Sequence, residues 1–469
     1  MVFSSPIFLF FFLPLVIAGY YLIKGSFRIF FLILVSLLFY AWDEPRYVFI
    51  LLLSIVINYA WGLIFYKTLD KHGYLRKLLM FFSVSSNLLI LVYYKYMNFA
   101  VTSVNTLLNT EYTFRSIILP IGISFFTFQG MSYIIDVYRK KVDVQKNPVT
   151  IAFYISFFPQ LLSGPIVRYT DIKDQIQNRT ETVEKFAGGA KRFIVGLAKK
   201  VLIADTLGFT ADQIFQNPAI QNTPATAWLG VLLFQLQVYF DFSGYSDMAI
   251  GLASIFGFSF RENFNYPNIS KTVTEYWRRW HISLSTWFRD YVYFPLGGSK
   301  RGNVYINLLI VFIVTGLWHG ASFSFIIWGL WNGLFLIIER VFKIQQTGRK
   351  ILVPIRFAVT MAVVLIGRVF FRDMGMSETL TYLGIMFGAV QPENAGFTTW
   401  YYLSVKIAAV LAIAIVASTP IIKTKFFETV IACHPSWKYV SAVLSLVLLL
   451  ISLVFAVSST YTPFVYFRF

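Results

Sequence analysis

The sequence TGLWHGAS at residues 315–322 places an imidazole, that of His319, between two glycines in a strongly apolar part of the chain. An imidazole has a reference pKa of about 6.5, so it can stay neutral and accept a proton near pH 7. His319 is therefore a candidate general base, and the alternative is a packing residue. Ser322 follows three residues later, but a serine nucleophile would also need an orienting acid, and none is adjacent.

The densest polar stretch, residues 274–298, reads TEYWRRWHISLSTWFRDYVYFPLGG and is followed by Lys300 and Arg301. On a helix it has a polar face and an aromatic face, which predicts an amphipathic helix lying at the membrane interface. The polar face consists of Arg278, His281, Ser285 and Arg289, and the other face of Trp277, Trp280, Leu284, Trp287 and Tyr291. This face is either a membrane anchor with snorkelling arginines or a binding site for a cytoplasmic anion such as a phosphorylated cofactor.

A second polar cluster consists of Gln237, Asp241 and Tyr245, which are spaced by four residues. They share one helix face if the helix continues through Gly244. Ionisable groups at membrane depth are costly and are functional candidates by default, here for substrate binding. The alternative is a hydrogen-bonded clasp between helices.

The composition of the chain indicates that these side chains belong to a membrane protein. The 469-residue chain is 57% hydrophobic and 13% charged, whereas soluble proteins have about 25% charged residues. Apolar stretches of about the length of a spanning helix recur throughout. The clearest are Pro6–Leu22, Tyr47–Tyr66, Leu78–Val92, Thr226–Phe240, Val353–Phe370, Tyr401–Thr419 and Tyr439–Val457. The sequence therefore predicts an all-α polytopic membrane protein.

The charged residues report topology rather than nucleic-acid binding. The formal net charge is +18, and short cytoplasmic loops of membrane proteins are rich in Lys and Arg. Basic and non-basic loops alternate, which predicts that both termini lie outside the cytoplasm and that the chain crosses the membrane about twelve times. A single cysteine and four histidines leave no disulfide framework or thiolate cluster, and we expect no metal.

Two stretches interrupt the alternation of loops. Pro148–Pro165 has cytoplasmic character on both flanks and is expected to dip into the membrane and return, while Ile194–Phe209 is short and contains two lysines. Met376–Val390 is expected to be a short surface helix. One membrane domain covers the chain, with N-terminal spans at 1–147, a catalytic core at 148–340 and C-terminal spans at 341–469. The lack of an internal repeat in the sequence favours a membrane-embedded transferase over a transporter.

Long motifs resemble the membrane-bound O-acyltransferase (MBOAT) superfamily. They are YWRRWHISLSTWFRDYVYFPLGGSK, GLWHGASFSFIIWGLWNG, LPIGISFFTFQGMSYIIDVYR, FFPQLLSGPI and YFDFSGYSDMAIGLA. The resemblance covers essentially the whole chain. It is nearest to the bacterial branch that includes the alginate O-acetyltransferase membrane subunit (AlgI), to which the teichoic-acid D-alanylation protein (DltB) is related.

The resemblance implies a helical funnel with about eleven or twelve spans plus re-entrant and interfacial helices. The hallmark histidine of the superfamily falls on His319, and the second polar site falls on His281. An acetyl group would pass from cytoplasmic acetyl-CoA, a substrate rather than a bound cofactor, to an extracellular polysaccharide of the alginate type. The residues that would bind this anionic donor are Arg278, Arg279, Lys300 and Arg301.

The resemblance also implies a setting and a partner. The protein would lie in the bacterial inner membrane and work with an extracytoplasmic acyltransferase of the SGNH type. Two alternatives remain open at this point. One is transfer of D-alanyl or another acyl group to a cell-wall polymer, and the other is a non-enzymatic transporter.

The last residues, TPFVYFRF, are dense in aromatic side chains and contain one tyrosine, Tyr466. One interpretation is an aromatic belt that anchors the last span. The motif also resembles the aromatic end of the small partner protein in D-alanylation systems, which implies that Tyr466 relays the acyl group. His319 would then act as the base during attack by the tyrosine hydroxyl.

Overall fold

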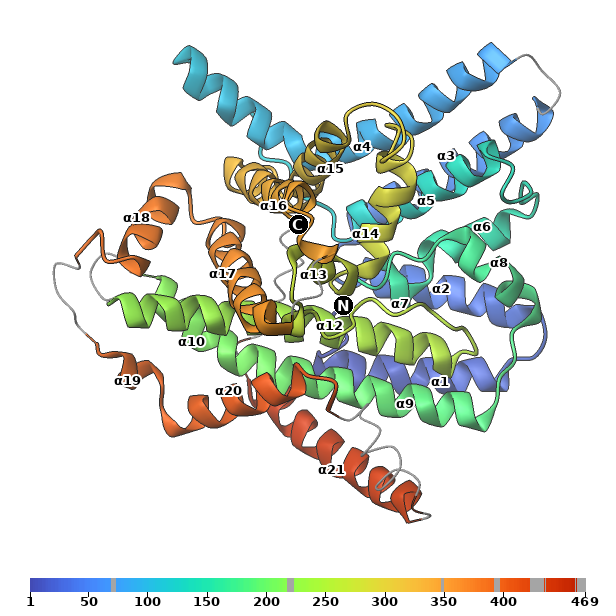
Figure 1. Ribbon diagram of the computed structural model, residues 1–469. Coiled ribbons are helices and arrows are strands. Elements are labelled where there is room, and N and C mark those ends of the chain that lie inside the picture. Colours follow the sequence, from blue (N-terminus) through green and yellow to red (C-terminus); the bar gives the residue numbers. More distant parts are fainter. Residues whose placement is uncertain are drawn as a thin grey trace. The chain divides into compact units, whose positions relative to one another are not determined.

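The structure is a computed structural model of the chain. It describes residues 1–68, 73–216, 223–346, 350–391, 397–421, 434, 436–459 and 461. Within these residues the ordered elements are helices, and no strand occurs (Figure 1). The predicted all-α fold is therefore confirmed.

Six helical segments of the described chain are long and apolar enough to span a membrane. They are Pro45–Lys67, which contains α3 (Val48–Lys67), α4 (Gly73–Leu108), α12 (Pro224–Ile255), α16 (Phe323–Val341), α17 (Val353–Phe371) and α21 (Trp437–Ser458). Four shorter apolar helices are Phe8–Leu22, which contains η1 (Phe8–Phe12) and α1 (Leu13–Leu22), α2 (Phe27–Ala41), α15 (Val304–His319) and α20 (Val405–Ala417). The chain is a multi-pass membrane protein, while the total of about twelve crossings remains a prediction.

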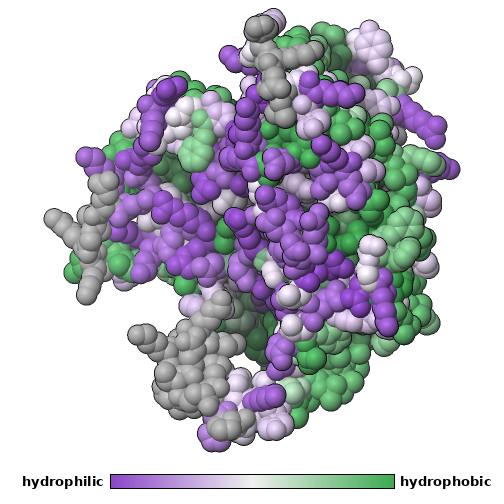
Figure 2. Space-filling view, turned by 90° about the vertical axis from the view of Figure 1, so that its right-hand side faces the viewer, coloured by the Kyte–Doolittle hydropathy of each residue, from purple (hydrophilic) through white to green (hydrophobic). Residues whose placement is uncertain are grey.

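The apolar helices differ in what covers them. In the most apolar part of α12, 78% of the residues are buried, whereas in α21 the share is 11%. Side chains such as Phe49 and Leu22 are well exposed although they are large and apolar. On the face in Figure 2, hydrophobic and hydrophilic residues gather in separate areas. Exposed apolar surface of this extent fits a lipid environment.

The chain forms two compact units. Unit 1 consists of Met1–Phe193 and Ser246–Arg261, and unit 2 of Ile194–Tyr245 and Glu262–Arg468, as far as these ranges are described. Both candidate histidines, His281 and His319, belong to unit 2.

Unit 1 contains a broken apolar segment where the sequence predicted a re-entrant stretch. The segment forms α6 (Pro148–Ser156) and α7 (Phe158–Leu161), which are separated by Phe157 with a ψ of 114°. Asn147 caps the first helix by accepting from the Val149 N–H. The stretch is thus two short helices, and its expected dip into the membrane and return stays a prediction. The other helices of unit 1 are α5 (Ile123–Tyr138), α8 (Tyr169–Asn178) and most of α9 (Val183–Ala198).

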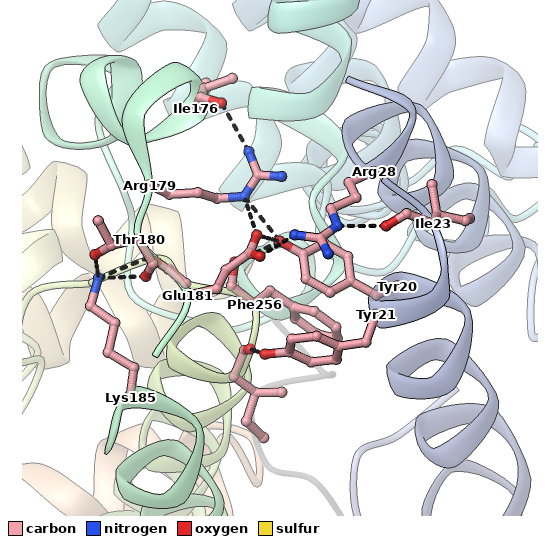
Figure 3. Close-up of polar contacts among 12 residues, drawn as sticks. Tyr20, Tyr21, Ile23, Arg28, Ile176, Arg179, Thr180, Glu181, Lys185 and Phe256 are labelled. Atoms are coloured by element: carbon pink, nitrogen blue, oxygen red, sulfur yellow. Dashed lines mark hydrogen bonds and ion pairs between the residues drawn. The ribbon is translucent and has the colours of Figure 1, made fainter. Parts of the chain in front are cut away.

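A polar cluster in unit 1 joins loops that the sequence places on one side of the membrane (Figure 3). Glu181, between α8 and α9, pairs with Arg28 of α2 and accepts a 2.5 Å hydrogen bond from the Tyr20 hydroxyl of α1. Arg179 donates from Nε to the same tyrosine hydroxyl at 3.0 Å. The loop after the first span and the charged stretch 168–192 are both expected to be cytoplasmic, and they meet here.

Loops expected on the other side also meet one another. The N-terminal ammonium group pairs with the carboxylate of Asp43, and the Tyr47 hydroxyl donates to the carbonyl of Ile118 at 3.1 Å. These contacts join the N-terminus, the loop after α2 and the segment after α4. The two sets of loops are therefore grouped as the alternation of basic and non-basic loops requires.

Unit 2 holds the remaining helices. After α9 the chain continues through the π-helix η3 (Lys199–Ala204) into α10 (Asp205–Phe215), so the predicted short segment 194–209 is part of a longer helical run. Within the predicted stretch Met376–Val390 the helix α18 covers Met376–Met386, while its position at the membrane surface stays a prediction. The short helix α19 covers Thr399–Tyr402.

The polar stretch 274–298 is not one helix, so that prediction is wrong. It forms α13 (Val273–Arg279), α14 (Ile282–Phe288) and the π-helix η5 (Arg289–Tyr293). The break lies at His281, whose φ of 43° is left-handed and cannot continue a helix. The predicted polar face does not form either, because His281 is buried while Arg278 is exposed.

The start of α13 is fixed from another helix. Glu339 of α16 accepts hydrogen bonds from the N–H groups of Val273 and Thr274, at 2.5 and 2.9 Å. The Thr272 hydroxyl accepts from the Glu275 N–H at 3.0 Å, which completes the N-terminal cap. These bonds position α13 against α16.

Candidate active site

The glycines around His319 serve close packing of α15 against α16. A Cβ added to Gly316 would lie 2.2 Å from the carbonyl oxygen of Phe325, and one added to Gly320 would lie 2.1 Å from the Phe325 ring. Gly320 has an extended backbone with a φ of −167°, so it ends α15 immediately after His319. Ser322 then caps α16. The tight turn between the two helices thus fixes the imidazole at a helix end.

His319 is buried in a cage of aromatic rings. Its side chain lies edge-to-face against Trp328 and Phe371, with ring centroids 4.9 and 5.1 Å away. Trp318 contributes a third wall at 4.9 Å. Only 1% of the residue is exposed. A base in such a site is shielded from bulk water, which strengthens its electrostatic interactions with a bound substrate.

His281 is held by an amide. Its Nδ1 lies 3.0 Å from Oδ1 of Asn263, which also accepts from the backbone N–H and the hydroxyl of Ser283 at 3.2 and 2.8 Å. Since that oxygen is the acceptor for the Ser283 N–H, Nδ1 of His281 carries the proton and Nε2 carries the lone pair. Burial lowers the pKa of His281 to about 3, so the ring stays neutral at pH 7.

Trp318 links the two histidines. Its indole lies 6.0 Å from the ring centroid of His281 and 4.9 Å from that of His319. The two imidazole centroids are therefore within about 11 Å of each other, which is the sum of these separations. The structure thus brings the two residues that the sequence singled out into contact with one indole.

A buried arginine beside this pair was missed by the sequence reasoning. Arg368 of α17 donates to Oε1 of Gln235 at 2.5 Å and to the hydroxyl of Tyr276 at 3.1 Å. Its guanidinium lies over the rings of Trp280 and Phe371, at 4.6 and 4.9 Å from their centroids. A single charge in an apolar run, VVLIGRVFF, is the signal that could have identified Arg368.

The second polar cluster takes part in an ion network. The helix α12 does continue through Gly244, and Asp241 is paired with Lys200 at 2.8 Å. Lys200 also pairs with Asp205 at 2.7 Å. Gln237 packs against Gly208, and Tyr245 is fully buried. These contacts favour the interpretation of a clasp between helices.

The four basic residues expected to bind a donor differ in whether they line a cavity. Arg278 lines two neighbouring cavities. Arg279 is bound by Glu275 at 2.9 Å and donates to the carbonyl of Asn265 at 3.1 Å. Lys300 and Arg301 are exposed and line neither cavity. Of the four, only Arg278 therefore faces these cavities.

The two cavities share Thr274, Arg278, Leu308 and Leu336. The first has a volume of about 560 Å³ and a mostly apolar wall that reaches Thr315, one helical turn before His319. The second, of about 460 Å³, is lined by Glu339 and by three cations, Arg278, Arg340 and Lys343. An anionic group fits the second cavity, and an uncharged arm fits the first.

The aromatic tail with Tyr466 lies outside the described residues. The last described residue, Tyr461, donates from its hydroxyl to Asp212 of α10 at 2.5 Å, and the same carboxylate accepts from Arg372 at 2.6 Å. Desolvation, and then the hydrogen bond to Asp212, raises the pKa of the Tyr461 phenol. Asp212 therefore anchors the chain five residues before Tyr466.

Three successive residues at the end of α17 connect this anchor to the histidine. Phe371 packs on His319, Arg372 binds Asp212, and Asp373 accepts from the Ser322 hydroxyl at 2.7 Å. The anchor of the tail and the turn after His319 thus share one short segment.

The fold and the site define a multi-pass helical membrane protein with two histidines buried in its interior and a basic cavity nearby. Comparison with known sequences is more specific. The sequence model of the MBOAT, membrane-bound O-acyltransferase family matches residues 37–377. The chain belongs to this family and is an O-acyltransferase.

Relatives of known name are similar over much of the chain. The probable alginate O-acetylase AlgI of Pseudomonas aeruginosa is 44% identical, over 85% of this chain and 76% of its own. The peptidoglycan O-acetyltransferase of Helicobacter pylori is 33% identical, over 67% of this chain and 65% of its own. The teichoic acid D-alanyltransferase of Bacillus subtilis is 33% identical over 44% of this chain and 55% of its own. The expected nearness to the alginate branch is confirmed.

Proposed function

We propose that this O-acyltransferase moves an acetyl group from cytoplasmic acetyl-CoA across the membrane, for O-acetylation of an extracellular polysaccharide of the alginate type. The observation that carries the proposal is the burial of His319 and His281 around the shared indole of Trp318, in a chain similar to a probable alginate O-acetylase over most of its length. The protein lies in the bacterial inner membrane with both termini outside the cytoplasm.

His319 is the general base of the reaction. It takes the proton of an acceptor hydroxyl while the hydroxyl oxygen attacks the carbonyl carbon of the thioester, and the carbonyl electrons move to the oxygen. The tetrahedral intermediate then collapses and the carbon–sulfur bond breaks. The departing thiolate takes the proton from the imidazolium, which leaves an acetyl ester and a free thiol.

His281 orients a substrate in this reaction. Because its Nδ1–H is bound to Asn263, its Nε2 lone pair is held in a fixed direction. Its low pKa keeps the ring neutral, so it accepts a hydrogen bond rather than supplying a charge. A hydroxyl or an amide N–H of a substrate is the donor that such a lone pair receives.

The basic cavity receives the phosphates of the donor. Arg278, Arg340 and Lys343 line it together, and phosphate groups favour arginine for its fork of donors. The apolar cavity that continues toward Thr315 would hold the uncharged arm that carries the thioester. Lys300 and Arg301, being exposed, would contribute to attraction of the anion rather than to its binding.

Tyr466 is the proposed acyl relay to the outside. Its hydroxyl would accept the acetyl group at His319 and present it to an extracytoplasmic acyltransferase of the SGNH type. The hydrogen bond of Tyr461 to Asp212 supports this proposal, because it holds the chain five residues before Tyr466. A five-residue stretch spans at most about 17 Å, which limits how far Tyr466 can lie from this anchor. An aromatic belt alone does not require such an anchor.

Transfer of D-alanine to a cell-wall polymer is the second candidate, because a teichoic acid D-alanyltransferase is 33% identical over part of the chain. The two candidates differ in the thioester that the enzyme consumes. A non-enzymatic transporter is not retained, since the family membership makes the chain an acyltransferase.

The test uses the full-length protein in proteoliposomes with acetyl-CoA labelled in the acetyl group. We expect turnover that falls by about 10²–10⁴-fold in His319→Ala and is unchanged in His434→Ala, whose histidine is exposed. Mass spectrometry should find the label on Tyr466, and Tyr466→Phe should remove it. Turnover of a D-alanyl thioester but not of acetyl-CoA would establish the second candidate instead, and full activity of His319→Ala would refute both.

A further inference from the structure

Arg368 is a charge in a costly position. It lies in α17, within a segment that can span the membrane, and only 3% of the residue is exposed. A charged side chain at membrane depth costs several kcal/mol unless it is paired or solvated. Such a residue is usually kept for function.

The groups that bind Arg368 do not neutralise it. Its Nε donates to the amide oxygen of Gln235 and its Nη2 to the phenol of Tyr276, and both partners are uncharged. Within the described chain, Nη1 is buried with no hydrogen-bond partner, and no carboxylate lies within ion-pair distance of the guanidinium. Two of the three guanidinium nitrogens are thus held, while Nη1 keeps a free N–H donor and the group as a whole keeps its positive charge.

The partners are themselves fixed, so the direction of the guanidinium is fixed too. The amide nitrogen of Gln235 donates to Asn268 at 2.9 Å, which turns the amide oxygen toward Arg368. The rings of Trp280 and Phe371 lie against the guanidinium. Arrangements of this kind, in which a donor is held before the charge appears, are typical of sites that stabilise a transition state.

Each of the two rings that stack on the guanidinium is next to one of the histidines, either in sequence or in space. Trp280 precedes His281, and Phe371 packs on His319 with ring centroids 5.1 Å apart. The guanidinium carbon is 4.9 Å from the Phe371 centroid, so it lies within about 10 Å of the His319 centroid, the sum of the two separations. The base and the cation thus contact the same ring, that of Phe371.

We propose that Arg368 is a catalytic residue that binds the oxyanion formed on the thioester carbonyl. The inference rests on the proposed acyl transfer, in which negative charge develops on that oxygen as the acceptor attacks. The free Nη1–H donates to this oxygen, and the guanidinium charge compensates it. When the intermediate collapses and the carbon–sulfur bond breaks, the charge passes to the departing sulfur, which is protonated by His319.

This assignment explains why the arginine lacks an acidic partner. A resident carboxylate would satisfy the guanidinium in the resting enzyme and weaken its interaction with the oxyanion. A purely structural cation would show the opposite arrangement, with a paired carboxylate and no free donor. Lys200, which is paired with Asp241 and Asp205, is the example of that arrangement in the same unit.

The test compares Arg368→Gln and Arg368→Lys with a control on the same helix, Arg356→Gln, in full-length protein that has reconstituted into proteoliposomes. We expect Arg368→Gln to lower kcat for labelled acetyl-CoA by about 10²–10³-fold. The KM and the affinity for a thioether analogue of acetyl-CoA, which forms no oxyanion, should change by less than about threefold. Arg368→Lys should recover part of the rate, and Arg356→Gln should match wild type.

Three results would overturn the inference. They are an unchanged kcat in Arg368→Gln, a loss that appears in KM and analogue affinity rather than in kcat, and a loss in both variants that follows a fall in thermal stability. If Arg368→Gln does not insert, Arg368→Lys and its thermal stability decide the matter. The ratio of the wild-type rate to the His319→Ala rate tests acyl transfer separately. A failure of the proposed function is therefore recognised before the rates of the arginine variants are interpreted.

Discussion

The buried neutral His281 predicts a specific acid sensitivity of the fold. In the folded protein burial lowers its pKa from 6.5 to about 3, so the unfolded chain binds more protons than the folded one between these two values. Stability therefore falls as the pH falls below about 6.5 and stops falling near pH 3. Since one pKa unit corresponds to about 1.4 kcal/mol, the full effect is about 5 kcal/mol, and the part between pH 7 and pH 5 is about 2 kcal/mol.

The assay is the unfolding free energy of the purified protein in detergent at pH 7 and pH 5, for wild type and His281→Gln. Glutamine retains a hydrogen-bonding group in the site but does not titrate in this range. We expect the variant to lose about 2 kcal/mol less than wild type on acidification, whatever its stability at pH 7. Equal losses in the two proteins would refute the reasoning, because another group would then account for the acid sensitivity.

Three further predictions concern packing, donor binding and the tail. Gly316→Ala should destabilise the protein by about 1–3 kcal/mol and lower turnover, because the added Cβ would lie 2.2 Å from a backbone oxygen of α16. Thermal unfolding measures the loss of stability, and an unchanged stability would contradict the prediction. Arg278→Glu should raise KM for acetyl-CoA by about tenfold or more through repulsion of the phosphates, while the exposed control Lys271→Glu should not; equal values would return Arg278 to the role of a membrane anchor. Tyr461→Phe keeps the ring but removes the hydrogen bond to Asp212. Acetylation of Tyr466 should therefore fall about tenfold, while binding of the thioether analogue of acetyl-CoA should not change. Normal labelling of Tyr466 would show that the anchor is dispensable.

The helices were predictable because the signals are local. An apolar run of the right length is read from consecutive residues, and basic loops report sidedness without knowledge of packing. The motif around His319 was informative for the same reason. Its two glycines lie three residues before and one residue after the histidine in sequence, and in the structure they allow Phe325 to approach α15.

The break at His281 was not predictable from its neighbourhood. The stretch 274–298 has helical periodicity, but His281 has a left-handed φ and a buried side chain. Asn263, which lies outside that stretch, binds both the His281 ring and the Ser283 hydroxyl in this conformation. A histidine that looked as though it shared a face with Arg278 is therefore inside the protein. Tertiary hydrogen bonds outweigh an intrinsic helical preference of a few tenths of a kcal/mol per residue.

The group around Arg368 could be predicted only in part. The arginine itself stands out in an apolar run, but Gln235 and Tyr276 come from two other helices, and Gln235 is two residues from the glutamine that spacing had singled out. Spacing by four finds residues on one helix face, whereas a site is assembled from faces of several helices. Three-dimensional placement was needed to separate Gln235, which binds Arg368, from Gln237, which packs against Gly208.

The charges of unit 2 are divided in a way that fits acyl transfer. The acidic residues Asp205 and Asp241 are bound to Lys200, and Asp212 is bound to Arg372 and Tyr461. Around Arg368, by contrast, the direct partners are neutral, and His281, which follows the stacked Trp280 in sequence, is neutral as well. A cation among neutral groups favours any state in which a substrate becomes negative. The attack of a hydroxyl on a thioester creates one such state, on the carbonyl oxygen. The same arrangement disfavours a cationic intermediate, so the base that becomes positively charged, His319, should release its proton quickly to the departing thiolate.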